Sequence, residues 1–219
     1  MWFVSRSNDA TDAGELAVRD DDGASIVKEH LHGYLRRQRE VLLWKLDGLG
    51  ERDARWPVTP TGTNLLGLLK HAASVEAGYF GFVFGRPFPE PLPWTEDDAE
   101  PNADMWATPE ESIASITALA HRVWEHADAT IDALDLDAPG RVPWWRGREE
   151  VTLGQVLVHV GVELARHAGH ADIVRETLDG ATGLSDGLSN LPEVEQQWWA
   201  DYVATLRRVA TEAGTRTTP

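Results

Sequence analysis

The chain has 219 residues, a formal net charge of −16, 42% hydrophobic residues and no cysteine. The negative charge would repel nucleic-acid phosphates, so nucleic-acid binding is not expected. The absence of cysteine excludes disulfides, thiolate metal sites and a cysteine nucleophile, so sulfur chemistry would need the sulfur of a bound molecule. Any metal would have histidine and carboxylate ligands.

Residues 1–23 are polar and acidic, without the basic start and long apolar segment of a signal peptide. No apolar run in the sequence reaches the roughly 18 residues of a membrane span. We therefore expect a flexible N-terminal segment at 1–23 and a helical domain at 24–219. The protein is predicted to be cytoplasmic and not to associate with membranes.

Apolar periodicity predicts the first two helices. The first covers residues 25–46, where apolar side chains recur at helical spacing. The second covers residues 64–84, with Thr63 as its N-cap and a stop at Gly85. The long proline-rich loop that follows exceeds the usual loop length, which is typical of a functional cover or a packed surface loop.

The segment TPEE predicts the start of the third helix. Thr108 would be the N-cap, Pro109 would lie in the first turn and Glu111 would complete a capping box. This helix is expected to continue to about Leu134.

A second capping box, formed by Thr152 and Gln155, predicts the start of the fourth helix, which would end before Gly180. A last helix is expected at 192–210, where Trp198 and Trp199 fit simple packing. The predicted fold class is therefore all-α, a four-helix bundle with an additional C-terminal helix.

Polar residues interrupt the inward-facing seam of the fourth helix. At steps of three and four residues this seam runs through Leu153, Val156, Val160, Glu163, His167, His170 and Val174. Glu163 and His167 occupy positions where valine or leucine is expected, and a buried carboxylate is costly without a partner. Side chains four residues apart lie one turn above each other, so both can reach one divalent cation between helices.

The second helix offers a third ligand by the same argument, because His71 interrupts its apolar seam. If neighbouring helices bring His71 opposite Glu163 and His167, the three form a metal site with an open coordination position, as in catalytic zinc sites. The alternative interpretation is a set of hydrogen-bonded core histidines, with Glu163 paired to Arg166 or to His167.

His159 and His170 flank these residues on the fourth helix. Either could orient a ligand, act as acid or base, or replace Glu163 as a ligand. The alternatives are a helix-surface histidine for His159 and an interhelical hydrogen bond for His170. The remaining histidines have polar neighbours and are predicted to lie on the surface: His30, His32, His121 and His126.

Five segments together resemble the DinB-like superfamily, and within it the actinobacterial branch of mycothiol-dependent enzymes. They are TGTNLLGLLKHAASVEAGYFG, RPFPEPLPW, WATPEES, WEHADATIDALDLDAPGRVPWW and LVHVGVELARHAGHADIVRE. The resemblance implies a four-helix bundle, often dimeric, with an open metal site built from one histidine of the second helix and an H-x3-H pair of the fourth. His71 and His167 match this pattern, whereas Glu163 stands where the middle histidine is commoner. A mycothiol-dependent maleylpyruvate isomerase is similar in having histidine, glutamate and histidine at these three positions.

The resemblance also implies a metal-dependent S-transferase that joins mycothiol, or a related low-molecular-weight thiol, to an electrophilic small molecule. The metal would be zinc, with nickel or manganese as alternatives, and the protein would form a homodimer. Trp145 could form a wall of the binding pocket and Arg166 could contact an anionic group. The alternative functions are a metal-dependent isomerase or hydrolase of the same fold, and a non-catalytic metal-stabilised binding protein.

Overall fold

The computed structural model describes residues 20–189 and 191–215. Its contacts divide the chain into two compact units, Met1–Gly180 and Ala181–Pro219, and each is described by itself. Residues 1–19, most of the N-terminal segment predicted to be flexible, lie outside the described part. No helix among the described residues is long and apolar enough to cross a membrane.

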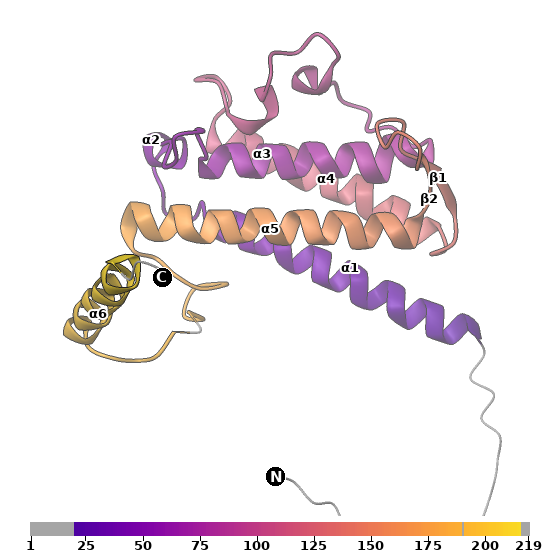
Figure 1. The fold of residues 1–219 in the computed structure, drawn as a ribbon. Helices are drawn as coiled ribbons and strands as arrows, with labels where there is room; N and C mark the ends of the chain where they lie inside the picture. The colour runs from indigo at the N-terminus through magenta and orange to yellow at the C-terminus, as the bar shows by residue number, and fades with distance from the viewer. Residues whose placement is uncertain (1–19, 190, 216–219) are drawn as a thin grey trace, which may run out of the picture. The chain divides into compact units, whose positions relative to one another are not determined.

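The first unit is a helical bundle (Figure 1). Helix α1 packs against α5, and α3 packs against both α4 and α5. The predicted all-α bundle is confirmed, and the additional helix, α6, lies in the second unit. The main helices are α1 (Asp20–Trp44), α3 (Leu65–Glu76), α4 (Ile113–Ala133), α5 (Leu153–Asp179) and α6 (Gln196–Thr215).

Two short elements were not predicted: helix α2 (Glu51–Ala54) and an antiparallel hairpin of β1 (Pro139–Arg141) and β2 (Glu150–Thr152). At Gly140 the hairpin passes against the ring of Phe84, and a Cβ there would lie only 2.6 Å from a ring carbon. Glycine therefore allows this close approach. The hairpin loop carries Trp144 and Trp145, which both donate hydrogen bonds to the hydroxyl of Tyr79, three residues after the end of α3.

The second predicted helix, 64–84, is not α-helical throughout. Helix α3 ends at Glu76, a π-helical turn follows at Ala77–Gly81, and a 3-10 turn at Phe82–Phe84 leads to Gly85 in the left-handed conformation. Its N-cap is Asn64 rather than Thr63, because the Asn64 side chain accepts a hydrogen bond from the backbone of Gly67 at 2.7 Å.

The predicted start of the third helix at Thr108 was also wrong, because α4 begins at Ile113 with Ser112 as its N-cap. The backbone N–H of Thr108 does donate to the carboxylate of Glu111 at 2.8 Å. That carboxylate also accepts a bond from the buried Lys70 of α3 at 2.9 Å, so TPEE forms a turn fastened to α3. The fourth helix follows the prediction, with Thr152 as N-cap and Gly180 as left-handed C-cap.

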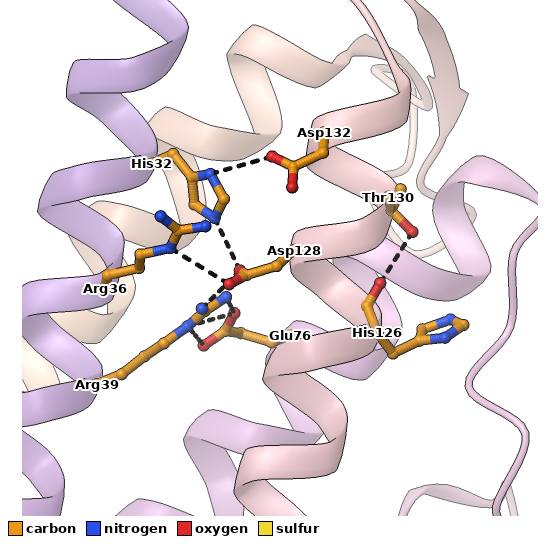
Figure 2. A network of polar contacts seen from close by, with 8 residues as sticks. All are labelled: His32, Arg36, Arg39, Glu76, His126, Asp128, Thr130 and Asp132. Carbon is orange, nitrogen blue, oxygen red and sulfur yellow. Dashed lines mark hydrogen bonds and ion pairs between the residues drawn. The ribbon is translucent and has the colours of Figure 1, made fainter.

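His32 is buried, which contradicts its predicted surface position. Its Nε2 lies 2.7 Å from a carboxylate oxygen of Asp128, which also accepts a bond from Arg39 at 2.7 Å (Figure 2). Arg39 in turn binds both carboxylate oxygens of Glu76. The polar partners of His32 thus come from α4, and the whole network joins α1, α3 and α4.

Candidate metal centre

His71 of α3 lies opposite Glu163 and His167 of α5, as the two seams predicted. One ligand atom from each of the three residues lies within 4.8 Å of the other two. Glu163 Oε1 is 3.0 Å from Nε2 of His167 and 3.8 Å from Nε2 of His71. The two imidazole rings are 4.7 Å apart and meet edge to face.

The three residues interrupt an apolar interface. Leu68 of α3 and Val160 and Leu164 of α5 are fully buried next to them along the chain. His167 is buried as well, whereas the side chains of His71 and Glu163 retain 18% and 31% of their exposure. The centre is therefore embedded in the α3–α5 interface on one side and accessible from the other.

Two imidazole nitrogens at the centre lack hydrogen-bond partners within the described residues. They are Nε2 of His71 and Nδ1 of His167, and both are buried. A buried polar atom without a partner is costly and calls for an explanation. Two imidazoles and a carboxylate form a donor set that zinc accepts, and an ion bound to Nε2 of His71 would satisfy that nitrogen. The residues present therefore fit a divalent metal.

Asp104, which no periodic pattern in the sequence marks, contacts the ring nitrogen of His71 on the other side from Nε2. Its Oδ2 lies 2.6 Å from Nδ1 of His71. A carboxylate in this position fixes the tautomer of a metal-binding histidine, so that the other nitrogen faces the ligand site. The hydrogen bond with His71 lowers the pKa of Asp104, which keeps this carboxylate ionised at neutral pH.

The long loop is fastened to α3 immediately after Asp104. The side-chain amide of Asn64 donates to the carbonyl of Met105 at 3.1 Å. That carbonyl lies so close to Gly67 that a Cβ there would be 1.8 Å from its oxygen. Only glycine leaves room for this contact. Asn64 and Gly67 thus hold Met105 against α3 and place the preceding residue, Asp104, beside His71.

The protonation states at the centre suit a cation. Burial raises the pKa of Glu163, but the hydrogen bond with His167 and the electrostatic influence of His167, His71 and Arg166 outweigh it, so the pKa is lowered overall. Burial, together with the charge of His71, lowers the pKa of His167. An ionised carboxylate and a neutral imidazole are the forms that bind metals.

Comparison with known families identifies the group to which this chain belongs. The family model of the mycothiol-S-transferases matches residues 30–180. The chain belongs to the mycothiol-S-transferase family. The resemblance inferred from the sequence segments is thereby confirmed, and the family implies an enzyme that transfers mycothiol. No curated protein gives a significant match.

In this member of the mycothiol-S-transferase family, His159 lies in an aromatic cluster beyond the metal centre. Its ring is 5.0 Å from that of Tyr79 and 4.6 Å from that of Trp145. The indole N–H groups of Trp144 and Trp145 both donate to the Tyr79 hydroxyl, at 3.1 and 3.0 Å. Burial lowers the pKa of His159. His159 thus lies one helical turn before Glu163, but it does not belong to the cluster of His71, Glu163 and His167.

The structure places His170 and Arg166 on the exposed side of α5. The ring of His170 is 5.3 Å from that of His167, and Arg166 contributes positive charge to the surroundings of Glu163. Neither belongs to the three-residue cluster. The roles predicted for them as a proton-handling group and an anion contact remain predictions.

Proposed function

We propose that the protein is a metal-dependent S-transferase that joins mycothiol to an electrophilic small molecule. The observation that carries this proposal is the convergence of His71, Glu163 and His167 around an unpartnered imidazole nitrogen, in a chain of this family. We propose zinc as the metal, with nickel and manganese as alternatives, because imidazole and carboxylate ligands accept all three.

A divalent cation at this centre would lower the pKa of a bound thiol, so that thiolate is present at neutral pH. The chain itself has no cysteine, so the sulfur comes from mycothiol. A carbon–sulfur bond forms while the leaving group departs with its electron pair, and the thiol proton passes to a base. His159 is our candidate for that base, because its lowered pKa keeps it neutral and able to accept a proton.

Asp104 and Glu163 would prepare the centre for this chemistry. Asp104 accepts the Nδ1 proton of His71 and so keeps Nε2 free. Glu163 brings a negative charge between the two imidazoles and would offset part of the charge of a bound cation. Trp145, fixed by its bond to Tyr79, would form part of the wall near the centre, and Arg166 would meet an anionic group of the co-substrate.

We also propose a cytoplasmic location, since low-molecular-weight thiols are kept reduced there. A homodimer, which the sequence resemblance implied, is likewise proposed.

The decisive experiment combines metal analysis with a conjugation assay on the purified full chain. We expect a stoichiometric divalent metal, and conjugation of mycothiol to monochlorobimane that requires both the metal and the thiol. His167→Ala should lose the metal and the activity while far-UV circular dichroism stays helical. Equal metal content in this variant would contradict the assignment of His167.

The same assay separates the alternatives. Hydrolysis without thiol would favour a metal-dependent hydrolase, and thiol-dependent rearrangement without net thiol consumption would favour an isomerase. Metal binding without turnover of any electrophile would favour a binding protein.

A further inference from the structure

A cavity of about 920 Å³ lies next to the candidate metal centre. Asp104, which bonds His71, is part of its lining. Val75, Gly78 and Phe82 also line it, and they follow His71 along the chain at steps of four, three and four residues. Val75 lies one turn after His71 in α3, and Gly78 and Phe82 lie in the π-helical and 3-10 turns that follow α3. The lining therefore runs from Asp104, beside His71, along the end of α3 and these turns toward Trp144 of the hairpin loop.

The walls of this cavity are largely apolar and aromatic. Its lining includes Tyr79, Phe82, Phe88 and Trp144, together with several prolines. The rings of Phe82 and Trp144 are stacked with 6.3 Å between their centroids. Tyr79 lies in the π-helical turn Ala77–Gly81, and the two indole N–H groups that bond its hydroxyl hold its ring in place. These surfaces suit a flat apolar group, and the volume falls in the range of small-molecule sites.

Every charged residue that lines the cavity is acidic: Glu90, Glu96, Asp97 and Asp104. Hydrogen bonds from Arg122 lower the pKa of Glu90, which is therefore ionised at neutral pH. Glu96 and Asp97 are exposed at the rim. No lysine or arginine is part of this lining, and Glu96 and Asp97 remain acidic beside the paired Glu90, so an anion that enters meets a lining of net negative charge.

We propose that this cavity binds the electrophile and selects neutral or cationic flat, apolar compounds, aryl compounds in particular, over anionic ones. The identity of the bound compound as the electrophile rests on the proposed S-transferase function, whereas the charge selectivity of the cavity does not. The same charges disfavour an isomerase that acts on an anionic substrate.

Binding can be tested without turnover by isothermal titration calorimetry on the full chain with unreactive probes. We choose 2-naphthylmethanol, 2-naphthylmethylammonium and 2-naphthoate, which share a ring system and differ in charge. The first two are expected to bind, and the naphthoate is expected to bind at least about tenfold more weakly because of the acidic lining. Equal affinity for all three, or tightest binding of the naphthoate, would overturn the selectivity.

The double variant Glu96→Lys/Asp97→Lys reverses the charge of the rim. It should strengthen naphthoate binding and weaken naphthylmethylammonium binding, each several-fold. The matched control, Glu40→Lys/Glu125→Lys, makes the same change in net charge at exposed positions of α1 and α4 outside the lining. If the control shifts the affinities as much as the rim variant does, overall charge rather than the cavity sets the preference, and the assignment fails.

Gly78 provides a test of location. A Cβ at Gly78 would lie 3.9 Å from the Trp144 ring, so a larger side chain there would grow into the cavity. Gly78→Leu should weaken binding of the two favoured probes at least about tenfold, a steric loss of about 1.4 kcal/mol or more, while metal content is unchanged. Should Gly78→Leu fail to fold, Gly78→Ala offers a smaller change that should give a smaller loss. Unchanged binding in a folded variant would overturn the location.

The two levels of the proposal fail separately. Mycothiol conjugation of monochlorobimane without the expected probe binding would leave the proposed function standing and remove the cavity assignment. Probe binding with the expected charge order, but no thiol-dependent turnover, would leave the cavity assignment standing and remove the proposed function.

Discussion

Glu163 is the residue that distinguishes this centre from one built only of histidines. Its Oε1 lies near both imidazoles, at 3.0 Å from His167 and 3.8 Å from His71, so it is placed to share a cation with them. Its pKa is lowered despite the opposing effect of burial, so it is ionised at neutral pH.

Glu163→Gln keeps the size of the side chain and removes its charge. We expect metal affinity to fall about tenfold to one hundredfold, the range for a disturbed metal site. Competition with a fluorescent chelator measures this directly. Glu176→Gln, at an exposed position of the same helix, is the control and should bind metal normally. Wild-type affinity in Glu163→Gln would leave Glu163 as a hydrogen-bond partner of His167 only.

Asp104→Asn tests whether the carboxylate next to Nδ1 of His71 strengthens metal binding. The amide oxygen can still accept the Nδ1 proton, but without a negative charge, so we expect metal affinity to decrease about tenfold while the fold is retained. Asp98→Asn changes an exposed residue of the same loop and should have no effect. The measurement is again chelator competition, and indistinguishable affinities of the two variants would show that Asp104 does not tune the centre.

Among the individual residues of the centre, helical periodicity in the sequence predicted the three candidate ligands but not the residue whose position depends on the path of a loop. His71, Glu163 and His167 could be recognised because each replaces an apolar residue at a regular step. Asp104 could not, because its contact with His71 spans 33 residues and depends on the Met105 carbonyl lying against Gly67.

Between helices, buried ion pairs decided where elements begin and how they are joined. The capping-box pattern at Thr108 predicted a helix start, and its backbone bond to Glu111 is present. The helix nevertheless begins later, at Ile113, and Lys70 of α3 binds the same carboxylate. Local propensity therefore predicted the hydrogen bond correctly, and tertiary contact changed the structure around it.

The network of His32, Arg39 and Asp128 makes acid stability a test of how α1 and α4 are joined. Burial would raise the pKa of Asp128, but the bond from His32 and the charge of Arg39 lower it from 3.8 to about 2. Because the folded state thus favours the ionised carboxylate, this stabilisation is complete above about pH 4 and is lost as the pH falls toward 2.

Asp128→Asn should therefore lower the free energy of unfolding by about 1–2 kcal/mol at pH 6, allowing for the part of the carboxylate that water reaches. The difference from wild type should shrink at pH 3, and urea denaturation at both pH values measures it. Asp132→Asn is the control, since Asp132 is 68% exposed and lies 3.7 Å from His32. A difference that does not change with pH would contradict the assigned pKa.

For the whole molecule, the question is how much of the chain the metal centre requires. The buried apolar cluster of the first unit draws all its members, and the partly buried residues packed on it, from positions 31–178. Helix α6 contributes no buried residue, and Trp198, Tyr202 and Leu206 are exposed along it at steps of four. The family match likewise covers residues 30–180.

Removal of residues 181–219 should therefore leave a folded, metal-binding unit. We expect the truncated chain to keep its metal stoichiometry and to melt within about 4 °C of the full chain, because no residue of its core is lost. Differential scanning calorimetry and metal analysis provide the measurements. A fall in Tm of more than about 10 °C would show that the second unit stabilises the first.

Light scattering on the full and truncated chains tests the proposed homodimer. If the exposed aromatic residues of α6 form its interface, the full chain is a dimer and the truncated chain is a monomer.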